Sequence, residues 1–423
     1  MGPLLAVDRP LPPDADPAIG VIRRLTDAGH VALLAGGCVR DLLRDAEPHD
    51  FDVATDALPD RVCSLFKATR KVGVQFGVVL VKQRGVWVEV ATFRSDGPYA
   101  DGRHPEHVTF SDAEHDARRR DFTINGMFLD PLARRIVDYV GGQTDLQRGI
   151  IRAIGDPAAR FAEDHLRLIR AVRFAARLGF EIEPQTWNAI VAAASQVGRV
   201  AAERIREELE KMLAHPGRGG ALRLLGETGL LQHLWPQPRW DPTQTPAAVE
   251  RLAALPPQAG FEAAFAMLTA RHDSPTLERI ARSLAFSNEQ REAVGWLVEK
   301  QAVLDDADAP SLAEFKTVMA HRAFRDLAAI ADARYSLLRD GDARRARLAA
   351  RIASIRPESV QPPPLVRGDD LLALGVRAGP VYKQVLDELY RRQLNEELQT
   401  REQAAAALQE LLRTLPQSPG EMP

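Results

Sequence analysis

The sequence predicts an α+β protein, in which a mixed α/β head precedes an all-helical neck, body and tail. Short β-branched runs separated by turn residues fill residues 1–150, whereas runs with helical spacing follow one another beyond that point. We therefore divide the chain into a head (1–150), a neck (151–235) and a body with tail (236–423).

The head is expected to alternate helices with short strands. An amphipathic helix over 18–28 ends at Gly29, and a strand over 31–35 leads through two glycines into a helix over 39–44. Further strands are expected over 51–54, 68–72, 77–82 and 87–93. In the neck, the spacing of apolar residues predicts helices over 161–178, 184–194, 202–213 and 220–228.

The composition is that of an ordinary globular protein. Hydrophobic residues make up 45% and charged residues 27% of the 423 positions, and the formal net charge is −3. Because the chain has no general basic excess, any RNA-binding surface must be a local basic stripe. The N-terminal segment lacks the pattern of a signal peptide, and no apolar run is long enough to span a membrane. We expect a cytoplasmic protein, with no membrane and no protein partner implied.

Two glycines and two carboxylates form the most informative constellation in the chain. Gly36 and Gly37 follow a hydrophobic strand, Arg40 enters on the next helical turn, and Asp50 and Asp52 lie one residue apart downstream. Glycines let backbone N–H groups approach phosphate oxygens, and the following helix start favours negative charge. Aspartates at i and i+2 of a strand point to one face, so both can ligate divalent metal ions. Each piece alone is common on protein surfaces, but together they fit phosphoryl transfer from a nucleoside triphosphate.

The compound pattern resembles the signature of the nucleotidyltransferase family that holds bacterial CCA-adding enzymes and class II poly(A) polymerases. The matching runs are Gly36-Gly37-Cys38-Val39-Arg40-Asp41-Leu42-Leu43 and Asp50-Phe51-Asp52-Val53-Ala54-Thr55. The resemblance implies a nucleotidyltransferase-type head in which Asp50 and Asp52 hold two Mg²⁺ ions. It also implies that Arg40 and the backbone at Gly36 and Gly37 meet the charge of a departing pyrophosphate.

An arginine cluster forms the second motif. The run Arg118-Arg119-Arg120-Asp121-Phe122-Thr123-Ile124-Asn125 resembles the family's Arg-Arg-Asp-Phe-Thr-Ile-Asn motif. Guanidiniums suit a triphosphate because each presents a planar fork of donors, although the arginines alone would also fit a solvated basic turn. By resemblance, Arg120 contacts the triphosphate and Asn125 assists it.

The third motif lies on the expected neck helix over 161–178. Asp164, Arg167, Arg170 and Arg173 recur at i+3 steps along one polar stripe. They would fit an intrahelical Asp–Arg ladder, or they would fit base reading. A carboxylate accepts from the exocyclic amine shared by cytosine and adenine, and a guanidinium donates to ring nitrogens or a carbonyl. The segment resembles the family's Glu-Asp-x-x-Arg motif, which implies that Asp164 and Arg167 read the incoming base while Arg170 and Arg173 contact the nucleotide.

Two further segments resemble parts of the same family. The run with Glu203 and Arg204 resembles the motif thought to brace the base-reading helix, so we expect a structural role for both residues. The run over 94–105 is rich in Gly, Pro and Asp and is predicted to be a mobile loop. It resembles the flexible loop of family members that add the terminal A.

Together the motifs predict a CCA-adding tRNA nucleotidyltransferase that uses CTP and ATP and holds tRNA by its helical arm. A poly(A) polymerase and an A-adding enzyme working with a CC-adding partner stay open as alternatives. The run over 72–77 lacks the Gly-Arg/Lys-Arg/Lys-Phe pattern of the poly(A) members, which favours tRNA repair. A noncatalytic RNA-binding scaffold is disfavoured, because gripping RNA requires neither the carboxylate pair nor the phosphate-binding arginines.

Overall fold

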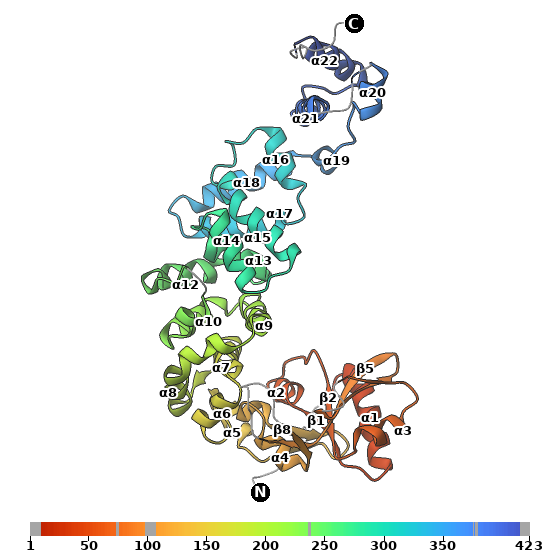
Figure 1. Ribbon diagram of the computed structural model, residues 1–423, viewed down its shortest axis with the longest axis vertical. Helices are drawn as coiled ribbons and strands as arrows, with labels where there is room; N and C mark the ends of the chain where they lie inside the picture. Colours follow the sequence, from red (N-terminus) through yellow and green to blue (C-terminus); the bar gives the residue numbers. More distant parts are fainter. Residues whose placement is uncertain are drawn as a thin grey trace. The chain divides into compact units, whose positions relative to one another are not determined.

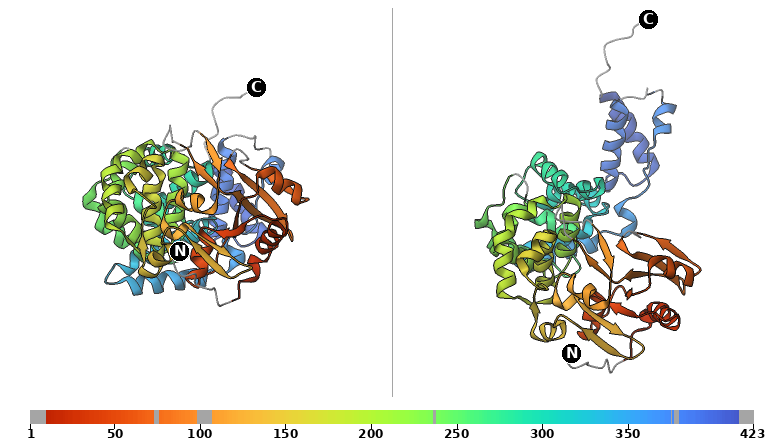
Figure 2. Two further views of the ribbon diagram at one scale, coloured as in Figure 1. Left: turned by 90° about the horizontal axis from the view of Figure 1, so that it is seen from below. Right: turned by 60° about the horizontal axis from the view of Figure 1, so that its bottom comes forward.

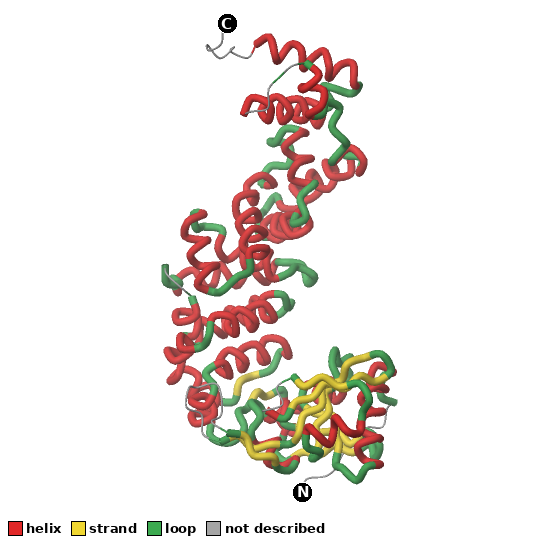
Figure 3. Tube along the Cα trace, turned by 45° about the vertical axis from the view of Figure 1, so that its right-hand side comes forward, coloured by secondary structure: helices red, strands yellow, loops and turns green. Residues whose placement is uncertain are grey.

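The computed structural model describes residues 10–72, 76–97, 107–235, 238–374, 376 and 380–414. The chain divides into two compact units, Met1–Val249 with Arg279–Phe286 and Glu250–Glu278 with Ser287–Pro423, and each is described by itself. In the described part of the chain, strands occur only in the first unit, and the second is helical (Figure 3). The α+β fold class predicted from the sequence is confirmed.

Seven strands form a mixed sheet at the centre of the first unit (Figure 1): β1 (Ala32–Ala35), β2 (Asp52–Thr55), β3 (Thr69–Lys71), β4 (Val78–Gln83), β5 (Val86–Thr92), β8 (Met127–Asp130) and β9 (Arg135–Asp138). Their order across the sheet is β3-β4-β5-β2-β1-β8-β9. β2 and β5 are parallel, and the other neighbouring pairs are antiparallel. Two short strands, β6 (Arg94–Asp96) and β7 (Val108–Phe110), pair separately.

Helices cover both faces of the sheet near β1. The helices of the head are α1 (Asp16–Asp27), α2 (Gly37–Leu43), α3 (Pro59–Leu65), α4 (Ala113–Arg118) and α5 (Gly142–Arg148), with a 3₁₀ turn, η3 (Thr123–Asn125). α1 buries Val21, Ile22 and Leu25 and packs on β1, β2, β4 and β5. On the opposite face, Ala113 and Ala117 of α4 join a core with side chains of β1 and β2. The β1–α2 turn is thereby held between two packed layers.

The neck helices complete the first unit: α6 (Pro157–Glu163), α7 (Leu166–Leu178), α8 (Pro184–Ala193), α9 (Ala202–Leu213), α10 (Arg218–Glu227) and α11 (Leu230–Leu234). A short parallel pair, β10 (Ile150–Ile151) with β11 (Glu181–Ile182), links the sequence before α6 to the end of α7. α7 packs on α9 and α10. The side of α7 that these two helices leave uncovered is therefore left for its polar residues.

One expected helix is broken in the structure. The sequence predicted a continuous helix over 161–178, but α6 ends at Glu163 and α7 begins at Leu166. Asp164 adopts an extended backbone with φ −145°, and its Oδ1 accepts a hydrogen bond of 3.0 Å from the Leu166 N–H. The aspartate satisfies an otherwise unpaired amide at the start of α7, which explains the break.

From Thr245 onward the chain is helical: α12 (Thr245–Ala254), α13 (Phe261–Thr269), α14 (Ser274–Ser283), α15 (Asn288–Lys300), α16 (Leu312–Met319), α17 (Phe324–Ser336), α18 (Gly341–Ser354), α19 (Pro357–Val360), α20 (Gly368–Ala373), α21 (Pro380–Leu394) and α22 (Arg401–Thr414). The last three lie together at the C-terminal end of the chain (Figure 2). Their shared core includes Leu371, Val385, Leu389 and Leu408. Among the described residues, none of the helices has the length and apolar character needed to cross a bilayer.

Candidate active site

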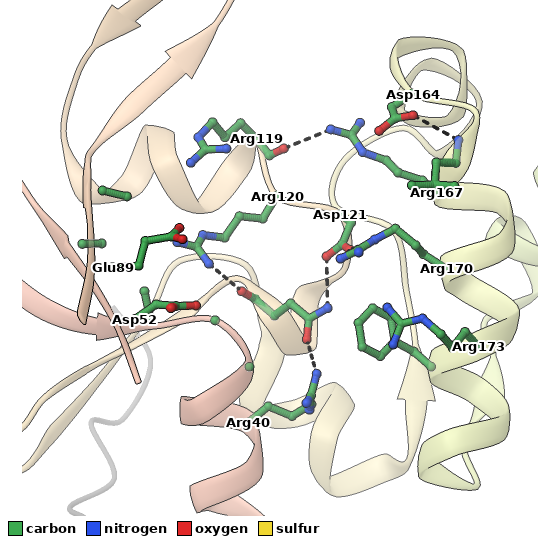
Figure 4. Close-up of a pocket in the computed structure, with 18 of the residues that line it drawn as sticks. Arg40, Asp52, Glu89, Arg119, Arg120, Asp121, Asp164, Arg167, Arg170 and Arg173 are labelled. Atoms are coloured by element: carbon green, nitrogen blue, oxygen red, sulfur yellow. Dashed lines mark hydrogen bonds and ion pairs between the residues drawn. The ribbon is translucent and has the colours of Figure 1, made fainter. Parts of the chain in front are cut away.

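A pocket of about 670 Å³ lies within the first unit, between the head sheet and α7. On one side it is lined by the β1–α2 turn, the start of β2 and the middle of β5. On the other side Arg167, Arg170 and Arg173 project from α7, as Figure 4 shows. All the predicted site residues except Asp50 are among its lining residues.

The glycine turn enters the pocket in a conformation that favours glycine. Gly36 has φ +73°, and a Cβ atom there would lie 2.8 Å from Nη1 of Arg120. The expectation that both glycine amides face phosphate is wrong for Gly36, whose N–H donates to the carbonyl of Met127 at 3.2 Å. Gly37 opens α2, where an amide has no partner within its own helix, so it is the better placed of the two.

Acidic side chains gather where β2 and β5 run side by side. Asp52 is the first residue of β2, and Glu89 of β5 lies next to it in the parallel pair, where Val53 is opposite Val90. Both side chains line the pocket (Figure 4). Asp50 is exposed and precedes the strand, so the expectation of two aspartates on one strand face is wrong in detail.

The charge on Asp52 is destabilised by its surroundings. Although its side chain is open to the pocket, the walls displace water, and this burial is the largest cause of a pKa raised to about 6. The negative charges of Glu89 and Asp50 raise the pKa further, and Arg120 opposes them. Within the described residues no three His, Cys, Asp or Glu side chains form a metal-ligand cluster, and the metal role of Asp50 and Asp52 stays a prediction.

Arg120 is held in place by an acid that the sequence motifs did not single out. Asp116 of α4 is only 1% exposed and accepts from Nε and Nη2 of Arg120 at 3.2 and 3.0 Å. It also accepts from Nε of Arg119 at 2.8 Å. Burial raises the pKa of Asp116, but the Arg120 and Arg119 guanidiniums more than offset it, so the pKa lies below its ordinary value. The signal in the sequence was an acid four residues before Arg120 on a helix.

Asp121 connects the head to α7. Its Oδ2 accepts from Nε and Nη2 of Arg170 at 2.9 and 2.6 Å, and its Oδ1 accepts from the Asn125 amide at 3.1 Å. Asn125 in turn accepts from Nη1 of Arg40 at 2.7 Å. Arg40 is 3% exposed and also donates twice to Asp41, so most of its donors are already engaged within the pocket wall.

The predicted base-reading residues reach the pocket, but they do not pair with each other. Asp164 accepts from both terminal nitrogens of Arg204, at 3.1 and 2.8 Å, and not from Arg167. Arg167 donates to Glu163 at 2.6 Å and to the carbonyl of Arg160 at 2.9 Å. The intrahelical Asp164–Arg167 ladder is therefore absent, because Asp164 lies before the helix begins.

The motif expected to brace α7 contacts it through one of the two expected residues and one further acid. Arg204 of α9 holds Asp164, in line with the expectation, whereas Glu203 is exposed. Glu208, one turn further along α9, is 3% exposed and pairs with both Arg173 and Arg170. These two ion pairs hold the guanidinium groups of Arg170 and Arg173 in place.

Two predicted features fall partly outside the described residues. Of the predicted loop over 94–105, only residues 94–97 are described, and the expectation is wrong for Arg94–Asp96, which form strand β6. Residues 73–75 of the run over 72–77 are not described.

Comparisons with known proteins agree with this geometry. The family described as poly A polymerase head domain matches residues 32–152, and the family described as probable RNA and SrmB-binding site of polymerase A matches residues 179–240. The CCA-adding enzyme of Geobacillus kaustophilus is 34% identical over 415 residues, which cover 95% of this chain and 98% of that protein. The CCA-adding enzyme of Geobacillus thermodenitrificans is 45% identical over 223 residues, so in that alignment the chain spans 55% of the relative's length.

Solved structures agree as well. The Bacillus stearothermophilus CCA-adding enzyme in complex with CTP superposes with a TM-score of 0.82 at 32% identity, covering 96% of this chain and 99% of that one. The Thermotoga maritima CCA-adding enzyme complexed with tRNA gives a TM-score of 0.65 at 18% identity, covering 97% and 100%, which shows a shared fold. The chain therefore belongs to the nucleotidyltransferase family of the CCA-adding enzymes.

Proposed function

We propose that this protein is a CCA-adding tRNA nucleotidyltransferase, which transfers CMP and AMP from CTP and ATP to the 3′ end of tRNA without a nucleic-acid template. The observation that carries the proposal is the pocket itself. It places the Asp52 carboxylate beside Arg120 and opposite the base-reading candidates Asp164 and Arg167. The similar Bacillus stearothermophilus enzyme was solved with CTP, which supports the choice of nucleotide. We place the reaction in the cytoplasm.

The reaction we propose is attack of the tRNA 3′-hydroxyl on the α-phosphorus of the nucleotide. A phosphodiester forms between the 3′-oxygen and the α-phosphorus, the bond from the α-phosphorus to the bridging oxygen of the β-phosphate breaks, and pyrophosphate leaves. The proton of the 3′-hydroxyl is released to water. Arg120 is close enough to Asp52 to lower the pKa of that carboxylate, so its positive charge also acts on a triphosphate bound there. Such chemistry depends on positioning and electrostatic stabilisation.

The acidic edge of the pocket fits a divalent cation, and we propose that Mg²⁺ is the ion. Asp50, Asp52 and Glu89 offer carboxylate oxygens, the ligands that hard cations prefer. Burial is the largest cause of the raised pKa of Asp52, and repulsion from Glu89 and Asp50 adds to it. A bound positive charge would relieve this repulsion. When bound, the ion would supply Lewis-acid activation of the hydroxyl and would neutralise charge on the pyrophosphate. Asp50 and Asp52 are the ligands that we propose, and Glu89 is the neighbouring carboxylate on β5.

The base would be read by fixed side chains. Cytosine and adenine share an exocyclic amine that a carboxylate can accept from, whereas uracil and guanine present a carbonyl at the equivalent position. Arg204 orients the Asp164 carboxylate, and Glu163 orients the Arg167 guanidinium, so both side chains are held before the nucleotide arrives. Arg170 and Arg173 line the same wall and are held by Asp121 and Glu208.

An assay with truncated tRNAs tests the proposal. Transcripts lacking CCA, CA or A are offered CTP, ATP, UTP and GTP singly and together, and the products are sized on a gel. We expect sequential addition of C, C and A that then stops. Continued addition of A would identify a poly(A) polymerase, and addition of A alone would identify an A-adding enzyme. The absence of any addition would contradict the proposed activity.

A further inference from the structure

The face of the sheet that lines the pocket continues beyond it. On β4 and β5, Val79, Val81, Val88 and Val90 are buried on one face, the face on which α1 packs. The alternate residues Val78, Glu89 and Ala91 belong to the other face and line the pocket. Leu80 and Trp87 extend this second face along the same two strands, and both are only half-buried.

The strand register places Trp87 close to the acidic edge of the pocket. Trp87 lies two residues before Glu89 on β5, a separation of about 7 Å along a strand. Directly opposite Trp87 on β4 is Lys82, and Leu80 separates Glu89 from Arg70 on β3. An aromatic ring and two cations from three neighbouring strands therefore meet beside the site of chemistry.

The two cations lie against the indole. The Arg70 guanidinium is 4.4 Å from the Trp87 ring centroid, and the Lys82 ammonium is 5.8 Å from it. Neither cation forms an ion pair with a carboxylate of the described residues. Their neighbours differ, since Lys71 pairs with Asp60 at 2.8 Å and Arg84 pairs with Asp16 at 2.9 Å. Within the described part of the chain, the positive charges of Arg70 and Lys82 thus lie on an aromatic surface without a carboxylate partner.

We infer that Arg70, Lys82 and Trp87, here called the strand platform, bind the single-stranded 3′ segment of the RNA primer just behind its terminal nucleotide. The inference rests on the proposed function and adds to it a site for the primer. Bases stack on aromatic rings and on guanidinium planes, and backbone phosphates bind to cationic side chains that have no acidic partner. Arg70 layered over Trp87 offers both kinds of contact.

Stacking also suits the reaction. The nucleotide behind the primer terminus changes at each addition, so a site for it must tolerate different bases. Stacking does so because every base has a π-face, whereas hydrogen-bonding edges would discriminate. Asp164 would therefore select the base of the incoming nucleotide by hydrogen bonding. Trp87 would hold the primer by stacking, whichever base the primer carries.

The first test is kinetic. Trp87→Ala should raise the KM for a tRNA lacking its terminal A by roughly 5- to 150-fold, with the KM for ATP little changed. Trp87→Phe, which keeps an aromatic face, should restore most of the loss. Arg70→Gln should lower the slope of log KM for tRNA against log salt by about 0.7, the value for one single-strand phosphate contact. Arg84→Gln is the matched control, with the same change in charge on the neighbouring turn but with an acidic partner, and should leave the slope unchanged.

The second test asks whether Trp87 and the base touch. A tRNA ending in CC is made with an abasic penultimate nucleotide, and its binding to wild type, Trp87→Ala and Trp87→Phe is measured. Removing the base from the tRNA and removing the ring from the protein should each weaken binding. The abasic tRNA should bind Trp87→Ala no more weakly than either single change allows, because both changes remove the same contact. Fully additive losses, or an unchanged KM in a Trp87→Ala protein with wild-type melting temperature, would overturn the inference. Wild-type nucleotide addition in the same assay would show that the proposed function survives that failure.

Discussion

Replacing Asp121 with Asn removes the charge that ties the head to α7 while keeping the size of the side chain. Asp121 is 9% exposed and receives two hydrogen bonds from Arg170, one from Asn125 and one from the Phe122 amide. Burial raises its pKa, but the Arg170 charge and these hydrogen bonds outweigh it, and the pKa falls from 3.8 to about 2. At about 1.36 kcal/mol per pKa unit, this lowering is equivalent to roughly 2 kcal/mol of folding free energy at neutral pH.

We therefore expect Asp121→Asn to destabilise the first unit by about 2 kcal/mol at pH 7. In a unit of this size, that corresponds to a melting temperature about 4–8 °C lower in a thermal melt. Asp60→Asn is the matched control, because Asp60 is exposed and its ion-pair partner among the described residues, Lys71, is exposed as well. It should change stability by less than about 0.5 kcal/mol.

The pH dependence gives a second check on the same variant. The pKa of Asp121 is depressed by folding, so its contribution is complete above the ordinary value of 3.8 and is lost as the pH falls toward about 2. The stability difference between wild type and Asp121→Asn, measured by denaturant titration, should be constant from pH 7 to about pH 5 and should shrink below about pH 4. A melting temperature unchanged by the substitution, or a difference that grows on acidification, would refute the reasoning.

Three further results are expected at the pocket. Asp164→Ala or Arg167→Ala should allow UTP and GTP to be incorporated while changing tRNA affinity little, and exclusion of both nucleotides by both variants would contradict the base-reading role. Divalent metal binding should weaken as the pH falls through about 6, where Asp52 takes up a proton, and Glu89→Gln should move this transition to lower pH in a Mn²⁺ titration. Gly36→Ala should cost about 1–3 kcal/mol of stability and raise the KM for the nucleotide, since its Cβ would displace the nearby guanidinium; a wild-type KM would contradict this.

The sequence predicted the elements of the head well where a residue pattern is local. The strands β1, β4 and β5 lie within a residue or two of their expected positions. Alternating apolar residues bury one face of β4 and of β5, and β1 is a short continuous apolar run that is buried on both faces. β8 and β9 were not predicted, and neither was α4. Their apolar residues pack on distant strands, which no local window reveals.

Within the site, the sequence identified which residues gather but not how they pair. Ten of the eleven predicted residues line one pocket, yet Asp164 pairs with Arg204 and not with Arg167, and Arg40 is engaged by Asp41. The Asp164–Arg204 pair is set by how α7 packs on α9 and by the break at the start of α7. Glu89 was missed because one acid on an alternating strand resembles an ordinary surface residue until the parallel pairing with β2 is known.

The most direct test of the account is nucleotide addition by carboxylate variants. Asp50→Ala, Asp52→Ala and the double variant are given a tRNA lacking CCA together with CTP and ATP, and tRNA binding is measured in parallel. We expect addition to be lost while the dissociation constant for tRNA stays close to that of wild type. Wild-type turnover in the double variant would contradict the claim that these two carboxylates are required for the chemistry.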